Sequence, residues 1–210
     1  MDRPQNRIAL LATTGVGLLG ALALTARVLR PCGDDSLPLP GDDLVPGATI
    51  VETHQIDIDA PAATIWPWLV QLGYGRGGFY SFDLLERLAG VGMTNARRIE
   101  PQWQDLAVGD QVRLAADAAL VVARLEPERC LVLSSDGGAA PPGAGMDFDF
   151  SWAFVLDEPG GLGSGGCRLR IRERYRPRRG ATTAVVRAMR PVARLMTYGM
   201  MWGLRRRCRA

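Results

Sequence analysis

PAATIWPWLVQLGYGRGGFYSFD, residues 61–83, carries more information about the fold than any other part of the chain. Pro61 suits the first turn of a helix, where its missing N–H would have no partner in any case, and Asp59 is expected to cap the exposed N–H groups. Apolar residues then recur at helical spacing on one face, namely Ile65, Trp68, Leu69 and Leu72. Gly73 is expected to end this helix. The stretch therefore predicts a short amphipathic helix that leads into a glycine-rich loop.

The loop GYGRGG at residues 73–78 contains four glycines and Arg76, and the adjacent aromatic residues Phe79 and Tyr80 follow it. A dinucleotide-binding fingerprint follows a strand and opens a helix, whereas this loop follows a helix, so it is not that motif. Two interpretations remain open. Backbone N–H groups around Arg76 could form a nest for a carboxylate or phosphate group, or the glycines could form a tight turn with positive φ.

Alternating patterns on both sides of this stretch predict β-strands. Residues 48–59 place four residues on one face, namely Ile50, His54, Ile56 and Ile58. Short strands are predicted at 110–115, 119–125 and 130–134, and a short helix at 81–88. The clearest alternation is at 148–156, where the side chains that share one face are Phe148, Phe150, Trp152, Phe154 and Leu156.

The next predicted strand, residues 167–176, has one face made only of arginines. These are Arg168, Arg170, Arg172, Arg174 and Arg176. The opposite face contains Glu173 and Tyr175. A hairpin with the preceding strand would set Asp147 and Asp149 near the arginines on the solvent side. We expect this pairing because five arginines on one face repel each other.

Residues 181–207 predict a long C-terminal helix. Its expected apolar stripe consists of Val185, Met189, Val192 and Met196. Pro191 removes one backbone hydrogen bond and is expected to kink or split the helix.

The N-terminal part of the chain is expected to lie outside the globular domain. Residues 8–28 are almost unbroken apolar sequence, long enough for a single membrane-spanning anchor within residues 1–30. Ala21 and Ala23 leave open a cleaved signal peptide instead. Arginine counts on the two sides are equal and do not orient the anchor. Residues 31–47, rich in Pro, Gly and Asp, predict an extended linker to a domain at 48–207.

The charge is distributed unevenly along the chain. All 25 basic residues are arginines, and residues 168–210 contain 14 of them with one acid, Glu173. Because the whole chain carries +3, residues 1–167 carry −10. A basic end predicts an anionic partner. Since no nucleic-acid-binding motif accompanies it, we expect the C-terminal arginines Arg205, Arg206, Arg207 and Arg209 to contact an anionic membrane surface and not nucleic acid.

A metal or cofactor site is not expected. The chain has one histidine, and its four cysteines show no metal-ligand spacing.

Residues 56–86, IDIDAPAATIWPWLVQLGYGRGGFYSFDLLE, resemble the start of membrane-associated proteins of the START-like helix-grip superfamily, also called SRPBCC. A second match follows, made by Asn95, Ile99, Pro101, Trp103, Gln104, Leu106, Gly109 and Asp110. The resemblance covers residues 48–205. It implies an α+β helix-grip fold, in which a curved antiparallel sheet wraps around the C-terminal helix and the first and last strands are neighbours.

The resemblance also implies a cavity between sheet and helix that binds an apolar or amphipathic ligand. The aromatic face of residues 148–156 points to the same place, because it is too large to leave in water. We expect the ligand to contact Trp68, Arg76, Phe79, Tyr80, Trp103, Phe148, Phe150, Trp152, Phe154 and Tyr175.

Three functions follow from such a cavity. The first is a membrane-anchored domain that binds a lipid or another hydrophobic small molecule. The second is an enzyme of cyclase or dehydratase type that uses His54, Glu173 and Tyr80. A buried His54–Glu173 pair could transfer protons, or it could simply be a satisfied polar contact. The third is a structural or interaction module whose cavity has closed.

Overall fold

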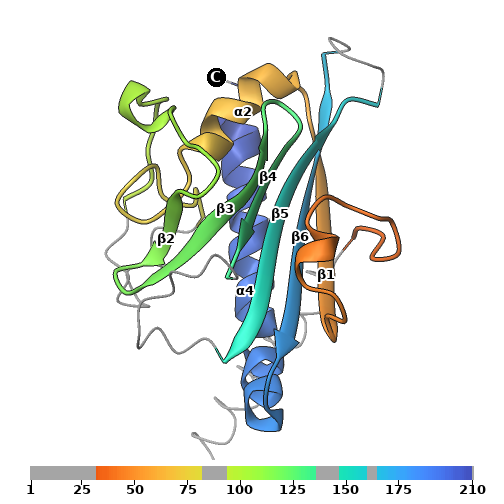
Figure 1. Cartoon of the computed structure of the whole chain (residues 1–210). Helices are drawn as coiled ribbons and strands as arrows, with labels where there is room; N and C mark the ends of the chain where they lie inside the picture. Colours follow the sequence, from red (N-terminus) through yellow and green to blue (C-terminus); the bar gives the residue numbers. More distant parts are fainter. Residues whose placement is uncertain (1–31, 82–93, 136–146, 160–164, 210) are drawn as a thin grey trace, which may run out of the picture.

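One antiparallel sheet forms the framework of the computed structural model, which describes residues 32–81, 94–135, 147–159 and 165–209 (Figure 1). Its six strands lie in the order β1-β6-β5-β4-β3-β2. They are β1 Ile50–Ile58, β2 Gln111–Ala115, β3 Ala118–Glu126, β4 Cys130–Ser134, β5 Phe148–Asp157 and β6 Cys167–Pro177. The predicted strands are all present, and their ends differ from the prediction by a residue or two.

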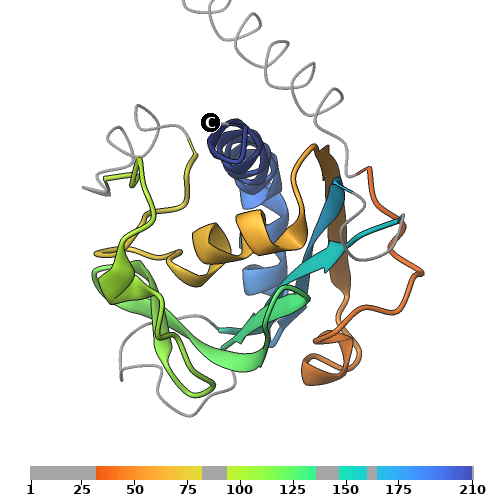
Figure 2. The same cartoon turned by 90° about the horizontal axis from the view of Figure 1, so that it is seen from above.

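Two α-helices cover the concave face of this sheet. The described part of the chain contains α2 Ala62–Val70, α4 Gly180–Arg207 and the 3-10 helices η1 Asp42–Leu44 and η2 Pro101–Trp103. Seen from above, the sheet curves around α2 and α4, which both lie on its concave side (Figure 2). The helix predicted at 81–88 falls almost entirely outside the described residues. The first and last strands are neighbours, as expected, because β1 pairs with β6.

The main core lies between the concave face and the two helices. Ile65 and Leu69 of α2, Phe154 of β5 and Ile171 of β6 are all completely buried. Each comes from the apolar face predicted for its element. Burying side chains of this size stabilises the fold by about 1.5–3 kcal/mol each. Because these buried residues lie on the predicted faces, the alternation of the strands and the helical spacing of α2 largely determine this core.

The C-terminal helix differs from its prediction in two ways. α4 is continuous through Pro191, so the helix is not split. The predicted stripe is wrong for three of its four residues, because Val185, Met189 and Val192 are 62%, 55% and 48% exposed, whereas Met196 faces the sheet. The first turns of α4 extend beyond the ends of the strands (Figure 1), where the sheet cannot cover them. The buried residues of the helix are Val186, Thr197, Gly199, Met200, Met201 and Leu204.

Residues 33–47 do not form the extended linker that their composition predicts, because they pack along the convex face of the sheet. Leu39 and Val45 are buried, and Leu39 joins a small apolar cluster with Val132. Gly41 has φ +91°, and a Cβ added to it would lie 2.5 Å from Val132 Cγ1. Only glycine satisfies both the backbone conformation and the gap.

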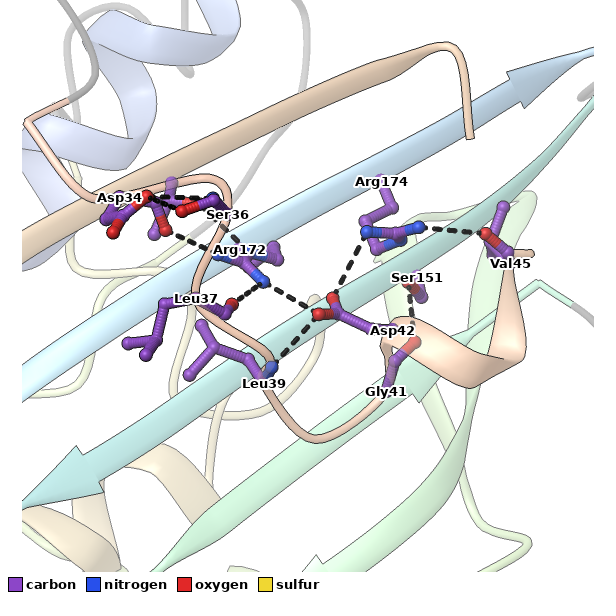
Figure 3. Close-up of polar contacts among 11 residues, drawn as sticks. Asp34, Ser36, Leu37, Leu39, Gly41, Asp42, Val45, Ser151, Arg172 and Arg174 are labelled. Atoms are coloured by element: carbon purple, nitrogen blue, oxygen red, sulfur yellow. Dashed lines mark hydrogen bonds and ion pairs between the residues drawn. The ribbon is translucent and has the colours of Figure 1, made fainter. Parts of the chain in front are cut away.

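Arg172 of β6 fastens this segment to the sheet (Figure 3). Its guanidinium donates hydrogen bonds to Asp42 Oδ2 at 2.8 Å and to Thr53 Oγ1 at 2.9 Å. It also donates to the carbonyl oxygens of Leu37 at 2.6 Å and Asp34 at 2.7 Å. The side chain is 1% exposed, which corrects the expectation that the whole arginine face of this strand meets solvent.

Elsewhere on that face, aspartates neutralise the arginines, as predicted for Asp149, whereas Asp147 contacts Arg179 outside the strand at 3.4 Å. Asp149 of β5 contacts Arg176 at 2.6 Å, and Asp157 contacts Arg170. This arrangement removes the repulsion that aligned guanidinium groups would otherwise cause.

The start of α2 is capped from a distant part of the chain. Asp59 does not cap the helix, because its carboxylate pairs with Arg209 at 2.7 Å. The backbone N–H of Ala62 instead donates to Glu158 Oε1 at 2.8 Å, a contact that only the folded chain creates.

Within the described ranges, which begin at residue 32, the structure has no helix of the length and hydropathy needed to cross a bilayer. The candidate anchor at 8–28 lies outside those ranges.

Candidate functional site

A cavity of about 270 Å³ lies between α4 and the concave face of β5 and β6. Its apolar lining consists of Phe79, Leu114, Phe148, Phe150, Trp152, Ala193 and Met196. The polar groups in its wall are Glu173, Tyr175 and Thr197. The cavity is therefore an aromatic chamber with one carboxyl group.

A second cavity of about 220 Å³ shares four wall residues with the first, namely Phe148, Glu173, Tyr175 and Ala193. It adds Glu52 of β1 and Arg190 of α4 to its lining. The two cavities thus lie side by side. The lining of the first is mainly apolar, whereas that of the second includes the charged side chains of Glu52 and Arg190.

Strand periodicity produces the aromatic wall. Alternate residues of β5 point to the concave side, and the register of the sheet sets Phe150 directly opposite Tyr175. Their ring centroids are 4.6 Å apart, and those of Phe79 and Trp152 are 5.7 Å apart. Such packed aromatic pairs hold a rigid apolar surface.

Glu173 is the carboxyl group of the aromatic cavity. Its Oε1 accepts a hydrogen bond from Thr197 Oγ1 at 2.9 Å, and its Oε2 accepts one from Tyr175 Oη at 2.7 Å. Burial raises the pKa of Glu173, and the two hydroxyl groups offset this effect only partly. The neutral acid is therefore more favoured here than in water.

Glu52 is the carboxylate of the second cavity. Arg194 binds it through two hydrogen bonds, from Nε to Oε2 at 3.0 Å and from Nη2 to Oε1 at 2.9 Å. Arg190 also donates from Nε to Oε1. Burial acts to raise the pKa of Glu52, but contacts with His54 and the two arginines outweigh it and lower the pKa to about 2. Glu52 is therefore ionised at neutral pH.

His54 does not form the expected pair with Glu173 across the ladder. The register sets His54 opposite Ile171 and Glu52 opposite Glu173. His54 is completely buried, and its Nε2 lies 3.7 Å from Glu52 Oε2, beyond hydrogen-bond distance. In the described part of the chain neither ring nitrogen has a hydrogen-bond partner. Its ring packs edge-on against Tyr198 with centroids 5.8 Å apart.

The structure divides the predicted ligand-binding residues into two groups. Those that line the aromatic cavity are Phe79, Phe148, Phe150, Trp152 and Tyr175. Trp68, Tyr80 and Phe154 belong to the buried core instead, and Trp103 lies in η2. Neither these four nor Arg76 line either cavity. Periodicity identifies an inward face but cannot separate its core positions from its cavity positions.

Tyr80 has a structural role. Its Oη donates to the carbonyl of Trp68 at 2.9 Å, and the guanidinium of Arg207 lies 4.6 Å from the centre of its ring. Burial raises the pKa of Tyr80, so this phenol stays protonated, and its side chain does not line either cavity.

The glycine-rich loop forms the tight turn, which was one of its two interpretations. Gly73, Gly75 and Gly78 have φ values of 128°, 75° and 74°. Arg76 donates to the carbonyl oxygens of Val70 at 3.1 Å and Trp103 at 2.8 Å. Its guanidinium therefore joins the end of α2 to η2.

Sequence reasoning missed Glu52, Arg190 and Thr197 as site residues. Glu52 could have been found, since it has the same strand parity as Ile50 and His54. The two α4 residues could not, because the rotation of that helix against the sheet is not encoded in its local pattern.

Over the residues that the structure describes, no group of three or more His, Cys, Asp and Glu side chains is arranged to hold a metal ion.

The order of the strands, with the first and last paired and a long C-terminal helix on the concave face, identifies the architecture. The chain has a helix-grip fold, in which a curved antiparallel sheet encloses a long C-terminal helix. No protein-family model matches the sequence, and neither does any curated protein.

Several solved structures resemble this helix-grip chain at low identity. A protein from Mesorhizobium loti is 20% identical, with a TM-score of 0.41, 75% of this chain covered and 96% of the other. A polyketide-cyclase-like protein from Corynebacterium glutamicum is 14% identical, with a TM-score of 0.41 and coverages of 77% and 92%. Norcoclaurine synthase from Thalictrum flavum is 13% identical, with a TM-score of 0.41 and coverages of 75% and 84%. Likeness at this level does not indicate a ligand or an activity.

Proposed function

We propose that this protein binds a small hydrophobic or amphipathic molecule in the aromatic cavity between α4 and the sheet. The observation that carries the proposal is the wall formed by Phe148, Phe150 and Trp152 around a single hydrogen-bonded carboxyl, Glu173. A mainly apolar lining with few polar groups is typical of small-molecule sites. At about 270 Å³ the cavity is slightly smaller than most such sites, which begin at about 300 Å³. This size favours a single chain or ring system over a whole phospholipid.

The test uses native mass spectrometry of the full-length chain extracted in mild detergent. A co-purifying small molecule is expected. Ala193 lines both cavities, so A193W should fill them and abolish binding. A188W is the matched control, because Ala188 is exposed on the same helix. Retention of the ligand by A193W would place it elsewhere, and a chain without ligand would favour the structural module with a closed cavity.

A second candidate function is acid–base catalysis in the same cavity. It is favoured by the raised pKa of Glu173, since a carboxyl that is neutral nearer to working pH can donate a proton to a bound substrate. Glu173 would act as the acid, held by Thr197 and Tyr175. Chemical conversion of the co-purifying molecule by the wild type but not by E173Q, with binding retained, would support it. Equal conversion by both proteins would refute it.

We also propose attachment to a membrane through residues 8–28, with help from the C-terminal arginines. Arg206 is exposed. Arg205 and Arg209 approach the exposed Asp59 at 4.0 and 2.7 Å, and such surface pairs exchange readily with other anions. Sedimentation with anionic and neutral vesicles at two salt concentrations tests the electrostatic part. Equal binding to both vesicle types would exclude a contribution from the arginines.

A further inference from the structure

Two arginines of α4 bind the carboxylate of Glu52, which lines the second cavity. Glu52 faces two guanidinium groups, those of Arg190 and Arg194. The other carboxyl in its wall is Glu173, whose burial favours the neutral acid. At Glu52, one carboxylate is therefore bound by two cations, and one of these, Arg190, also lines the second cavity.

The two arginines bind Glu52 differently. Arg194 uses Nε and Nη2 in a bidentate contact with both carboxylate oxygens, the strongest geometry for such a pair. Arg190 donates through Nε alone. Among the described residues its Nη1 and Nη2 atoms have no hydrogen-bond partner, and its side chain is 32% exposed. Arg194 thus neutralises Glu52, and Arg190 is the surplus cation.

The other α4 residues that line the cavity beside Arg190 are apolar. Its cavity is also lined by Val186, Met189 and Ala193 of α4, and Ala193 and Phe148 continue into the aromatic chamber. A molecule that extends through both spaces needs an apolar body at one end and a group that accepts hydrogen bonds from a guanidinium at the other. A carboxylate has this geometry, because its two oxygens match two N–H donors of arginine.

We propose that the ligand of the two cavities is a small amphipathic anion, with a carboxylate on an apolar body. The carboxylate accepts hydrogen bonds from Nη1 and Nη2 of the Arg190 guanidinium. The apolar body lies against Phe150 and Trp152. This inference rests on the proposed function, and it adds the class of ligand and the residue that selects it. Arg190 has the role of a specificity-determining residue.

The test compares three probes with the same chain and different heads: decanoate, decanol and decyltrimethylammonium. Each is titrated into the full-length chain in nanodiscs of neutral lipid, at a pH where decanoate is ionised, with empty nanodiscs as the blank. Tryptophan fluorescence reports binding, since Trp152 lines the cavity. We expect decanoate to bind about tenfold more tightly than decanol, as a charge-assisted pair requires, and the cation to bind most weakly.

Three variants assign the selectivity to one side chain. R190Q should lose about tenfold in decanoate affinity and keep its decanol affinity, because Arg194 still holds Glu52. R190K keeps the charge and should retain most of the affinity for decanoate. R187Q is the control, since Arg187 is exposed one turn earlier on α4 and makes the same change in charge. It should change neither affinity.

The outcomes separate the two proposals. Equal binding of decanoate and decanol by the wild type, or an equal loss of both in R190Q, overturns the anion site while the hydrophobic cavity stands. Failure of all three probes overturns the proposed function and the anion site together. Melting curves by circular dichroism show whether R190Q is folded. If R190Q is not folded, the order of affinities of the three probes for the wild type still tests the anion site.

Discussion

Arg172 and Asp42 are 130 residues apart in the chain, and their side chains form an ion pair at 2.8 Å on the convex face of the sheet. The side chain of Arg172 is 1% exposed and that of Asp42 is 26% exposed. The guanidinium has almost no access to water, so Asp42 is its main neutralising partner. Through this pair, residues 33–47 become part of the domain and cover the back of β6.

Removal of Asp42 should therefore destabilise the whole domain. In D42A the buried guanidinium loses its counter-charge, and loss of one partner of a buried pair costs about 3 kcal/mol. The measurement is urea unfolding followed by far-UV circular dichroism. D43A is the control, because Asp43 is 65% exposed and its contact with Arg124 lies on the surface. It should change stability by less than about 0.5 kcal/mol. Similar losses in both variants would contradict this account of Arg172.

Glu52 should make the protein sensitive to acid. Its pKa is lowered to about 2 from an ordinary value of 4.5, so the folded state favours the ionised form. The stabilisation is present above pH 4.5 and is lost as the pH falls toward 2. E52Q should lower the free energy of unfolding at neutral pH by on the order of 3 kcal/mol, and the difference from wild type should vanish near pH 2. E126Q, in an exposed pair with Arg129, should show no such convergence.

Glu173 should have the opposite effect on the pH dependence of stability. Its pKa is raised above the ordinary 4.5, so the folded state binds a proton more tightly than the unfolded state does. Its contribution to stability is present below pH 4.5 and is lost as the pH rises through the folded pKa. The free energy of unfolding of the wild type should therefore fall relative to E173Q as the solution becomes less acidic. A constant difference between the two proteins over the whole pH series would refute the raised pKa.

Gly203 should tolerate no side chain. A Cβ at this position would lie 2.0 Å from the carbonyl oxygen of Tyr80, where α4 passes the end of the glycine-rich loop. G203A should destabilise the protein by about 1–3 kcal/mol through overpacking, although alanine is the better helix former. G180A is the control in the same helix, because nothing lies within 4 Å of a Cβ there. It should be neutral or slightly stabilising, and a stabilising G203A would contradict the close contact.

Local pattern was sufficient for much of the fold. The alternation of Phe148, Phe150 and Trp152 predicted both the strand and the face that meets the helix, because side chains of a strand alternate whatever it pairs with. The spacing of Ile65 and Leu69 predicted α2, because residues four positions apart lie on the same face of a helix. The resemblance added the order of the strands, which local pattern cannot supply.

The site was predicted less completely. Phe79 and Tyr175 line the cavity as expected, whereas His54 stands opposite Ile171 and leaves Glu52 opposite Glu173. Strand parity says that these residues face inward. Which inward residue of one strand meets which residue of the next depends on register, and register is set by pairing between distant segments.

What the sequence determined by itself was the set of elements, their inward faces and the aromatic lining, since these depend on periodicity within a few residues. Tertiary structure alone decided that residues 33–47 cover Arg172 and that Val185 and Met189 stay exposed on α4. It also decided that Arg190 has donors beside the cavity that no other described residue binds. The physical reason is that each of these facts depends on where a segment docks, and docking brings together charges and surfaces from opposite ends of the chain.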